Sequence, residues 1–292
     1  MIPAAFDYIA PQSLDEALRV LAAHGEEAKL LAGGHSLLPL LKLRLANPKL
    51  LIDLSKVPGL SGISQQDDKI VLGALATHYQ IESSKLLKSK CPLLPETARF
   101  IGDVQVRNRG TIGGSLTHAD PCADWPAAIL ALGGELKLSG PNGERRIAGE
   151  EFFLGTMTTA IEPTEILTEI RVPVLSRRCG SAYLKMAQQA SGFAVVGIAV
   201  WLRLDTKGRC EDIGVGVTGL SEKPFRARPV EERLRGNKLT PKLIEESAAQ
   251  VAEGGDPLED LHASAKFRAH LAQVYTSRAL QEAVKRALGR KV

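Results

Sequence analysis

The sequence predicts an α+β fold built from two domains. In the first 56 residues, helical and strand patterns alternate, which indicates a small parallel α/β unit. Two hairpin patterns follow, around Asp67-Asp68 and around Pro141-Asn-Gly143, and they indicate antiparallel pairing. Beyond residue 180, three apolar strand patterns and then two helical patterns indicate a three-stranded antiparallel sheet with helices. We therefore expect a first domain at 1–176, with lobes at about 1–56 and 57–176, and a second domain at 177–292.

The composition narrows the class of protein. The chain has 292 residues, with 37 lysines and arginines against 33 acidic residues, and its net charge of +4 is too small to indicate a nucleic-acid partner. No apolar run approaches the ~20 residues that span a bilayer, so any membrane contact is expected to be at most peripheral. The first residues lack the basic flank and apolar stretch of a signal peptide, which favours a cytoplasmic protein. The four cysteines lie far apart, so this chain alone shows no iron–sulfur or zinc motif.

Local signals place each element of the first lobe. Ser13-Leu-Asp-Glu16 is a capping-box pattern, and apolar residues at helical spacing follow it as far as Gly25, the expected C-cap. A short strand then runs to Ala32, a helix covers 37–45, and a strand covers 50–54. This alternation of helix and strand is what predicts the small parallel unit.

The second lobe is expected to mix hairpins with helices. Its elements, in order, are a hairpin at 62–66 and 69–74, a helix capped by Thr77, a helix at 93–101, a glycine-rich loop at 102–121, a helix N-capped by Asp124 with Pro126 in its first turn, a hairpin at 135–138 and 145–147, and a strand at 165–172. A long glycine-rich stretch between such elements usually carries function.

Residues 173–180 are the expected linker to the C-terminal domain. Its strands are expected at 182–186, 193–204 and 210–219, and its helices at 241–253 and 264–288. The third strand contains Gly214-Val-Gly-Val-Thr-Gly219, which satisfies the G-x-G-x-x-G pattern of a Rossmann turn. Because Pro224 and Pro229 follow where that motif requires a helix, we interpret these glycines as positions of close packing in a strand.

The stretch Lys29-Leu-Leu-Ala-Gly-Gly-His-Ser36 predicts a strand, a tight turn and the start of a helix. Gly33 and Gly34 permit backbone angles closed to other residues, and they let a ligand approach the main chain. The N–H groups after the turn have no partner within the helix and point out from its positive end, which suits a phosphate or diphosphate. A tight turn without a ligand is the alternative for this segment taken alone.

A second stretch, Arg109-Gly-Thr-Ile-Gly-Gly-Ser115, repeats the arrangement of two glycines and a hydroxyl residue. Two such turns, poor in side chains and with exposed amides, could clamp one diphosphate from two sides. A dinucleotide such as FAD creates that need. Arg107 and Arg109 are expected either to neutralise phosphate or to pair with surface carboxylates, and the sequence favours neither.

No motif indicates acid–base or nucleophilic catalysis. His35, His78 and His118 lack any metal-ligand spacing, which favours ordinary polar roles for all three. The G-x-S-x-G pattern of a nucleophile elbow does not occur. We therefore assign no catalytic residue and no metal ligand to this chain.

Both glycine stretches resemble those of a known family. Ala32-Gly-Gly-His-Ser36 followed by Leu-Leu-Pro, and Arg107-Asn-Arg-Gly-Thr-Ile-Gly-Gly-Ser115 followed by His-Ala-Asp-Pro-Cys-Ala-Asp124, resemble the FAD subunit of molybdenum hydroxylases. This family includes the medium subunit of aerobic carbon monoxide dehydrogenase and the flavin domain of xanthine dehydrogenase. The similarity extends from Phe6 to the last helix and includes Tyr183-Leu-Lys-Met and Phe267-Arg-Ala-His270.

The resemblance implies a two-lobed FAD-binding domain of the p-cresol methylhydroxylase (PCMH) type, with FAD between the lobes. It also implies a C-terminal domain like that of CO dehydrogenase flavoproteins. In such proteins the first segment and Thr111 to Ser115 hold the diphosphate, and the stretch around Lys185 lies by the flavin ring. The residues expected to contact FAD are Ala32, Gly33, Gly34, His35, Ser36, Leu37, Ala74, Thr77, Gly110, Thr111, Gly113, Gly114, Ser115, Asp124, Leu167 and Lys185.

The resemblance further implies an electron-transfer subunit of a larger complex. A large subunit would carry molybdopterin and a small subunit would carry [2Fe–2S] clusters, in a dimer of heterotrimers, and this chain would pass electrons to quinone, NAD⁺ or O₂. Two departures bear on the acceptor more than on FAD binding: relatives often carry an acidic residue at Gly192 and asparagine at Ser115. A stand-alone flavin oxidase or reductase and a scaffold that has lost FAD are the alternatives.

Overall fold

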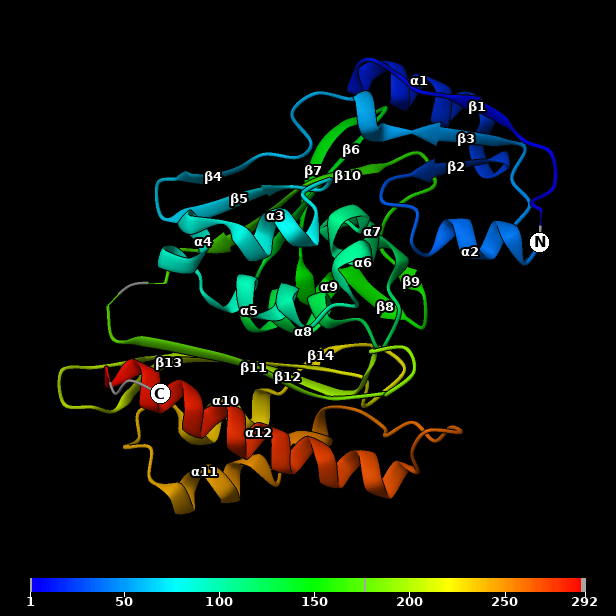
Figure 1. Cartoon of the computed structure of the whole chain (residues 1–292). Helices are drawn as coiled ribbons and strands as arrows, with labels where there is room; N and C mark the ends of the chain where they lie inside the picture. The colour runs from blue at the N-terminus through cyan, green and yellow to red at the C-terminus, as the bar shows by residue number, and fades with distance from the viewer. Residues whose placement is uncertain (1, 176, 290–292) are drawn as a thin grey trace.

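The computed structural model describes residues 2–175 and 177–289. A small N-terminal lobe, a larger mixed lobe and a C-terminal domain follow one another along the chain, and a separate hydrophobic cluster lies in each. Figure 1 shows the larger lobe between the other two bodies. The predicted α+β class, with an antiparallel C-terminal sheet and helices, is confirmed.

The small lobe contains a parallel sheet with the strand order β1-β3-β2. Its elements are β1 (Asp7–Ile9), α1 (Leu14–His24), η1 (Gly25–Glu27), β2 (Ala28–Leu31), α2 (Leu37–Lys42), β3 (Leu50–Asp53) and η2 (Leu54–Lys56). Ser13 and Gly25 cap α1 as predicted. The sequence does not reveal β1, because a three-residue strand has no periodicity of its own and depends on pairing with β3. The predicted helix 37–45 is confirmed but ends at Lys42.

The larger lobe is built on an antiparallel sheet with the order β4-β5-β10-β6-β7. Its strands are β4 (Ile63–Gln66), β5 (Lys69–Gly73), β6 (Glu135–Gly140), β7 (Gly143–Ala148), β8 (Phe153–Gly155), β9 (Thr158–Thr159) and β10 (Ile166–Pro173). Its helices are α3 (His78–Ser83), α4 (Lys85–Lys90), α5 (Leu93–Arg99), α6 (Val104–Arg109), α7 (Ile112–His118), α8 (Asp124–Ala131) and α9 (Gly149–Phe152). Both predicted hairpins are confirmed, as is the cap of α3 by Thr77.

The predicted glycine-rich loop at 102–121 is wrong, because most of it is helical. Asp103 caps α6 by accepting from the Val106 N–H, and Thr111 caps α7 by accepting from the Gly114 N–H. Helix α7 buries Ile112 and Leu116 in the core of the lobe. These caps and this burial stabilise helices in a stretch whose glycine content argues against them.

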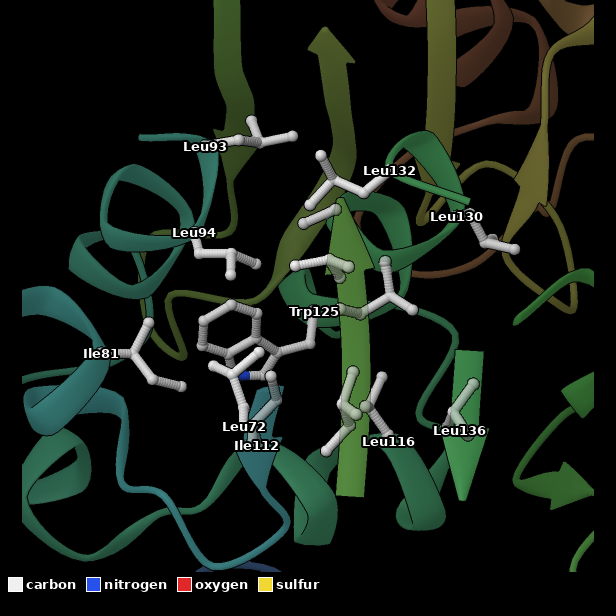
Figure 2. Close-up of a cluster of buried hydrophobic side chains, with 14 of the residues drawn as sticks. Leu72, Ile81, Leu93, Leu94, Ile112, Leu116, Trp125, Leu130, Leu132 and Leu136 are labelled. Atoms are coloured by element: carbon white, nitrogen blue, oxygen red, sulfur yellow. The ribbon is translucent and has the colours of Figure 1, made fainter. Parts of the chain in front are cut away.

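The predicted N-cap role of Asp124 is also wrong. Ala123 is the N-cap of α8, without a side-chain hydrogen bond, and Asp124 is the first helical residue. Its carboxylate turns instead toward Lys185 of the C-terminal domain. The next residue, Trp125, lies in the middle of the core of the larger lobe among leucine and isoleucine side chains, as Figure 2 shows.

The C-terminal domain has four strands in the order β11-β12-β13-β14, one more than predicted. Its elements are β11 (Cys179–Ala187), β12 (Ala194–Leu204), β13 (Cys210–Thr218), β14 (Phe225–Arg226), α10 (Arg228–Leu234), α11 (Pro241–Ala248), η3 (Val251–Gly254) and α12 (Ala265–Ala287). The prediction for the last helix is confirmed. The predicted helix 241–253 is divided into α11 and η3, and the sequence analysis did not identify the short β14 and α10.

Glycines let helices approach both faces of this sheet. A Cβ added to Gly214 or Gly216 of β13 would lie 1.9 Å from the carbonyl oxygen of Ala131 or Ala127 in α8. A Cβ added to Gly180 of β11 would lie 1.9 Å from the Ala283 carbonyl oxygen in α12. The interpretation of the G-x-G-x-x-G pattern as close packing in a strand is therefore confirmed.

The predicted linker at 173–180 contains the connection between β10 and β11, but Pro173 is the last residue of β10 and residues 179–180 already belong to β11. Residue 176 is outside the described residues. Whether the domains divide there stays a prediction. Within residues 2–175 and 177–289, no helix combines the length and the apolar character that a bilayer crossing needs.

Candidate functional site

A cleft of about 890 Å³ lies between the small lobe and the larger lobe, and the β11–β12 loop reaches it. Its volume is within the range of small-molecule and cofactor sites. Most of the predicted site residues line it: Ala32, Gly33, Gly34, His35, Ser36, Leu37, Ala74, Gly110, Thr111, Gly113, Gly114, Ser115, Asp124 and Leu167. Two predicted residues are not among its lining: Thr77 caps α3, and the Lys185 side chain is only 3% exposed.

The first glycine segment, residues 32–37, joins β2 to α2 and offers free backbone donors. Gly34 has φ +78, a conformation that a side chain makes costly. The N–H groups of residues 33–37 donate no hydrogen bond to any of the described residues. Because these residues also line the cleft and lead into a helix, their amides are available to an anionic oxygen there.

The second glycine segment, residues 110–115, uses its amides inside the fold. The N–H groups of Ile112 and Gly113 donate to the carbonyl oxygens of Ala76 and Ala74, at 3.0 and 2.8 Å. The Gly114 N–H donates to Thr111 Oγ1 at 3.1 Å. The expectation that both segments present exposed amides is therefore wrong for the second one, whose hydroxyl residues Thr111 and Ser115 line the cleft.

The absence of side chains is what allows the two segments to meet. A Cβ on Gly33 would lie 2.3 Å from the Arg109 carbonyl oxygen and 2.8 Å from Gly110 Cα. A Cβ on Gly113 would lie 2.5 Å from the Cβ of Ala74. At Gly33 the two lobes are thus in backbone contact beside the cleft, and a ligand such as a diphosphate can approach the main chain there.

The two arginines beside the second segment have different roles. Arg107 donates to Glu82 at 2.8 Å and to the carbonyl oxygens of Ile101 and Gly102, so it pairs with a carboxylate of its own lobe. Arg109 is exposed and contributes its carbonyl oxygen to the contact with Gly33. Surface pairing is therefore the role that the structure assigns to Arg107.

A buried polar cluster lies at the end of the cleft nearest the C-terminal domain. Lys185 Nζ lies 2.9 and 3.1 Å from the two carboxylate oxygens of Asp124. It also donates to the carbonyl oxygens of Phe100 and Gly192, at 2.8 and 2.6 Å. Tyr183 donates to Asp124 at 2.5 Å. Lys185 therefore holds in place the Asp124 carboxylate and, through Gly192, the β11–β12 loop.

Burial sets the electrostatics of this cluster. It raises the pKa of the Asp124 carboxyl, while the Lys185 ammonium and the Tyr183 hydroxyl favour the charged form. Burial and the neighbouring Asp124 charge raise the pKa of Tyr183 well above its usual value, so Tyr183 stays a hydrogen-bond donor at neutral pH. The cluster is thus an ion pair completed by neutral donors and acceptors.

Several cleft residues are missed by the sequence analysis. One group, residues 161–163 and 165–166, comes from the segment that leads into β10 and from the first residue of that strand, and another comes from the β11–β12 loop, residues 191–193. Both groups are far in sequence from the glycine segments, and no local motif marks them. His35, His78 and His118 also line the cleft. No group of three or more His, Cys, Asp or Glu side chains in the described part of the chain could hold a metal ion.

The cleft between the two lobes, with its glycine segments, is typical of a dinucleotide-binding protein. Residues 4–175 match the sequence profile of the family described as "FAD binding domain in molybdopterin dehydrogenase". Residues 181–283 match that of the "CO dehydrogenase flavoprotein C-terminal domain". The chain belongs to this family of FAD-binding medium subunits of molybdenum hydroxylases, and it is an oxidoreductase subunit.

Relatives match over nearly the whole chain. The carbon monoxide dehydrogenase medium chain of Hydrogenophaga pseudoflava is 39% identical over 97% of this chain and 98% of its own length. The 6-hydroxypseudooxynicotine dehydrogenase complex subunit alpha of Paenarthrobacter nicotinovorans is 37% identical over 98% of this chain and 97% of its own length.

Solved structures are similar over the same extent. A carbon monoxide dehydrogenase structure from Hydrogenophaga pseudoflava superposes with a TM-score of 0.95 at 39% identity, covering 100% of both chains. The quinoline 2-oxidoreductase of Pseudomonas putida 86 superposes with a TM-score of 0.92 at 32% identity, covering 99% of this chain and 100% of its own. The family resemblance of the two glycine stretches is therefore confirmed, and with it FAD as the cofactor of this chain.

Proposed function

We propose that this chain is the electron-transfer subunit of a molybdenum hydroxylase complex. A large subunit with molybdopterin oxidises the substrate, a small subunit with [2Fe–2S] clusters hands the electrons on, and this chain delivers them to quinone, NAD⁺ or O₂. The observation that carries the proposal is the cleft between the lobes, where five consecutive amides of the first glycine segment are free to bind an anion. The names of the relatives, which include dehydrogenase medium chains and complex subunits, support it.

The residues of the chain would hold FAD in place rather than react themselves. The amides of the first segment and the hydroxyls of Thr111 and Ser115 would hold the diphosphate. Lys185, with Asp124 beside it, would support the part of FAD nearest the C-terminal domain. Leu167 would add a contact, and Ala74 and Thr77 would lie near the first segment. When bound, FAD supplies the redox chemistry, while the protein supplies binding, orientation and the local field.

The proposal extends to assembly and location. We expect a dimer of heterotrimers in the cytoplasm, with at most peripheral membrane contact. We also propose that residues 1–176, with their lobes at about 1–56 and 57–176, bind FAD and that 177–292 form the second domain. The four cysteines of this chain support the division of labour, because they lie apart and leave the clusters to a partner.

Purification of the tagged chain together with its partners tests this function. Two further subunits should co-purify, and the visible spectrum should show both flavin and [2Fe–2S] absorption. Reoxidation of the substrate-reduced complex by a quinone, by NAD⁺ and by O₂ should then identify the acceptor as the one that restores the flavin absorption fastest. Turnover by the chain alone would indicate a stand-alone flavin enzyme, and a colourless chain within a complete complex would indicate a scaffold.

A further inference from the structure

His78 occupies a buried position beside the cleft that the proposed function does not use. It is the first residue of α3, and only 4% of the residue is exposed. Its backbone N–H donates to the Gly110 carbonyl oxygen at 2.9 Å. Helix α3 is thereby joined to the second glycine segment, and the imidazole lies among the residues that line the cleft.

A hydrogen bond from the core fixes the state of this imidazole. Trp125 Nε1–H donates to His78 Nδ1 at 3.0 Å. An indole N–H can only donate, so Nδ1 must be the acceptor and the proton of the neutral ring is on Nε2. Burial lowers the pKa of His78 to about 4, with a smaller effect from the charges of His35 and Arg107. The ring is therefore neutral at physiological pH, with one tautomer selected.

The other nitrogen points to the place where the two glycine segments meet. A Cβ added to Gly110 would lie 2.6 Å from His78 Nε2, so the imidazole packs directly against the backbone there. The same Gly110 is the residue against which Gly33 of the first segment packs. Among the described residues, His78 Nε2 has no hydrogen-bond partner, and it is not one of the fully buried polar atoms that lack one. Because His78 lines the cleft, its Nε2–H is available to an acceptor on a ligand that enters the cleft.

We propose that the Nε2–H of His78 donates a hydrogen bond to the diphosphate of bound FAD, which makes His78 a cofactor-binding residue. The inference rests on the proposed FAD site and adds to it a side-chain donor that no sequence motif marks. The amides of the second glycine segment donate within the fold, so the Nε2–H of His78 would be the ligand donor near Gly110. Because the ring is neutral, it contributes direction without adding a charge to the cleft.

Two substitutions separate this role from a structural one. In His78→Asn, the side-chain oxygen can take the place of Nδ1 and accept from Trp125, but the donor toward the cleft is lost. In His78→Gln, the side-chain amide can reach the place of Nε2 and donate to the cleft, while the partner of Trp125 is lost. A role in FAD binding and a role as a partner of Trp125 therefore predict opposite results for the two variants.

Titration of the deflavinated full-length chain with FAD measures both variants. We expect His78→Asn to weaken FAD binding by about tenfold to a hundredfold, which corresponds to one hydrogen bond to a charged group. We expect His78→Gln to stay within about threefold of the unmodified chain and to lose thermal stability. Unchanged binding in His78→Asn, or weakening by His78→Gln that equals or exceeds it, overturns the proposal.

Titration with ADP places the contact on the ligand. If the donor reaches the diphosphate, His78→Asn weakens ADP binding by the same factor as FAD binding. A loss for FAD without a loss for ADP places the contact on the flavin half and overturns the assignment to the diphosphate. An unmodified chain that binds neither FAD nor ADP refutes the proposed FAD site itself, and that result is distinct from a failure confined to His78.

Discussion

The two glycine segments of the cleft look alike in sequence, yet the fold uses their backbones in different ways. The first joins a strand to a short helix, and its amides at 33–37 remain free. The second begins α7, and its amides donate to Ala74, Ala76 and Thr111. We therefore propose that the first segment binds the ligand through its backbone, whereas the backbone of the second segment supports the fold and only its side chains reach the ligand. The same residue types act differently because both segments line the cleft, but only the second also donates its amides to the residues that follow β5, Ala74 and Ala76.

Gly33→Val should cause the largest loss of FAD affinity, because it displaces the first segment. A Cβ there would lie 2.3 Å from the Arg109 carbonyl oxygen, so the segment must shift and take its free amides away from the diphosphate. We expect FAD affinity to fall more than a hundredfold, which corresponds to the loss of at least two charge-assisted hydrogen bonds. Flavin absorption per mole of purified chain measures it. Gly62→Val, in open space, is the matched control, and full flavin content in Gly33→Val would contradict the comparison.

Gly113→Ala should act mainly on stability, because the second segment is built into the fold. The added Cβ would lie 2.5 Å from the Cβ and 2.6 Å from the carbonyl oxygen of Ala74. Overpacking of this kind costs about 1–3 kcal/mol of unfolding free energy. Denaturant unfolding measures the loss, and Gly155→Ala, with no neighbour within 4 Å, should show little. An unchanged midpoint in Gly113→Ala would mean that the segment is less constrained than its contacts indicate.

Thr111→Val should separate capping from ligand binding. The Thr111 hydroxyl accepts from the Gly114 N–H, and loss of such a cap costs about 1 kcal/mol. Thr240 caps α11 in the same way, through the Leu243 N–H, far from the cleft in sequence. We expect both Thr→Val variants to lower the melting temperature by a similar amount and only Thr111→Val to weaken FAD binding. Equal FAD affinity in the two would place the Thr111 hydroxyl outside the site.

Ser115→Ala should give the smallest effect. Ser115 is one of the hydroxyl residues of the second segment that line the cleft, so removal of its hydroxyl should weaken FAD binding about tenfold, the low end of the range for one hydrogen bond to a charged group. Ser36→Ala in the first segment should change the affinity less than twofold, because free amides bind there without the side chain. Equilibrium titration with FAD compares them, and the reverse order would invert the roles assigned to the two segments.

Local sequence signals predict the first segment well and the second poorly. The turn at Gly33 and Gly34 and the cap at Thr77 depend on residues next to one another, and these predictions are confirmed. Helices α6 and α7 were missed because glycines and polar residues outnumber apolar ones between 102 and 121. Two capping patterns in that stretch, at Asp103 and Thr111, were the signals available to find them.

Long-range contacts account for the other errors. Asp124 has the residue type and position of an N-cap, but a lysine 61 positions later takes its carboxylate. His78 follows a helix cap and looks like an ordinary polar residue, yet Trp125, 47 positions later, selects its tautomer. No window along the sequence contains both members of such a pair. The family resemblance identifies the cofactor, which the local patterns leave open, and the contact residues that it implies stay predictions.

Helix α8 limits how proteins of this kind can be recombined. Its first residue is Asp124 at the cleft, and its carbonyl oxygens at Ala127 and Ala131 lie against the glycines of β13. A chimera that joins residues 1–176 of this chain to the C-terminal half of a relative would place a foreign strand on a native helix. Any side chain at the positions of Gly214 or Gly216 would push α8 away from β13 and displace Asp124, the first residue of α8. Hybrids should therefore fold only when both parents have matching residues at the contact between α8 and β13.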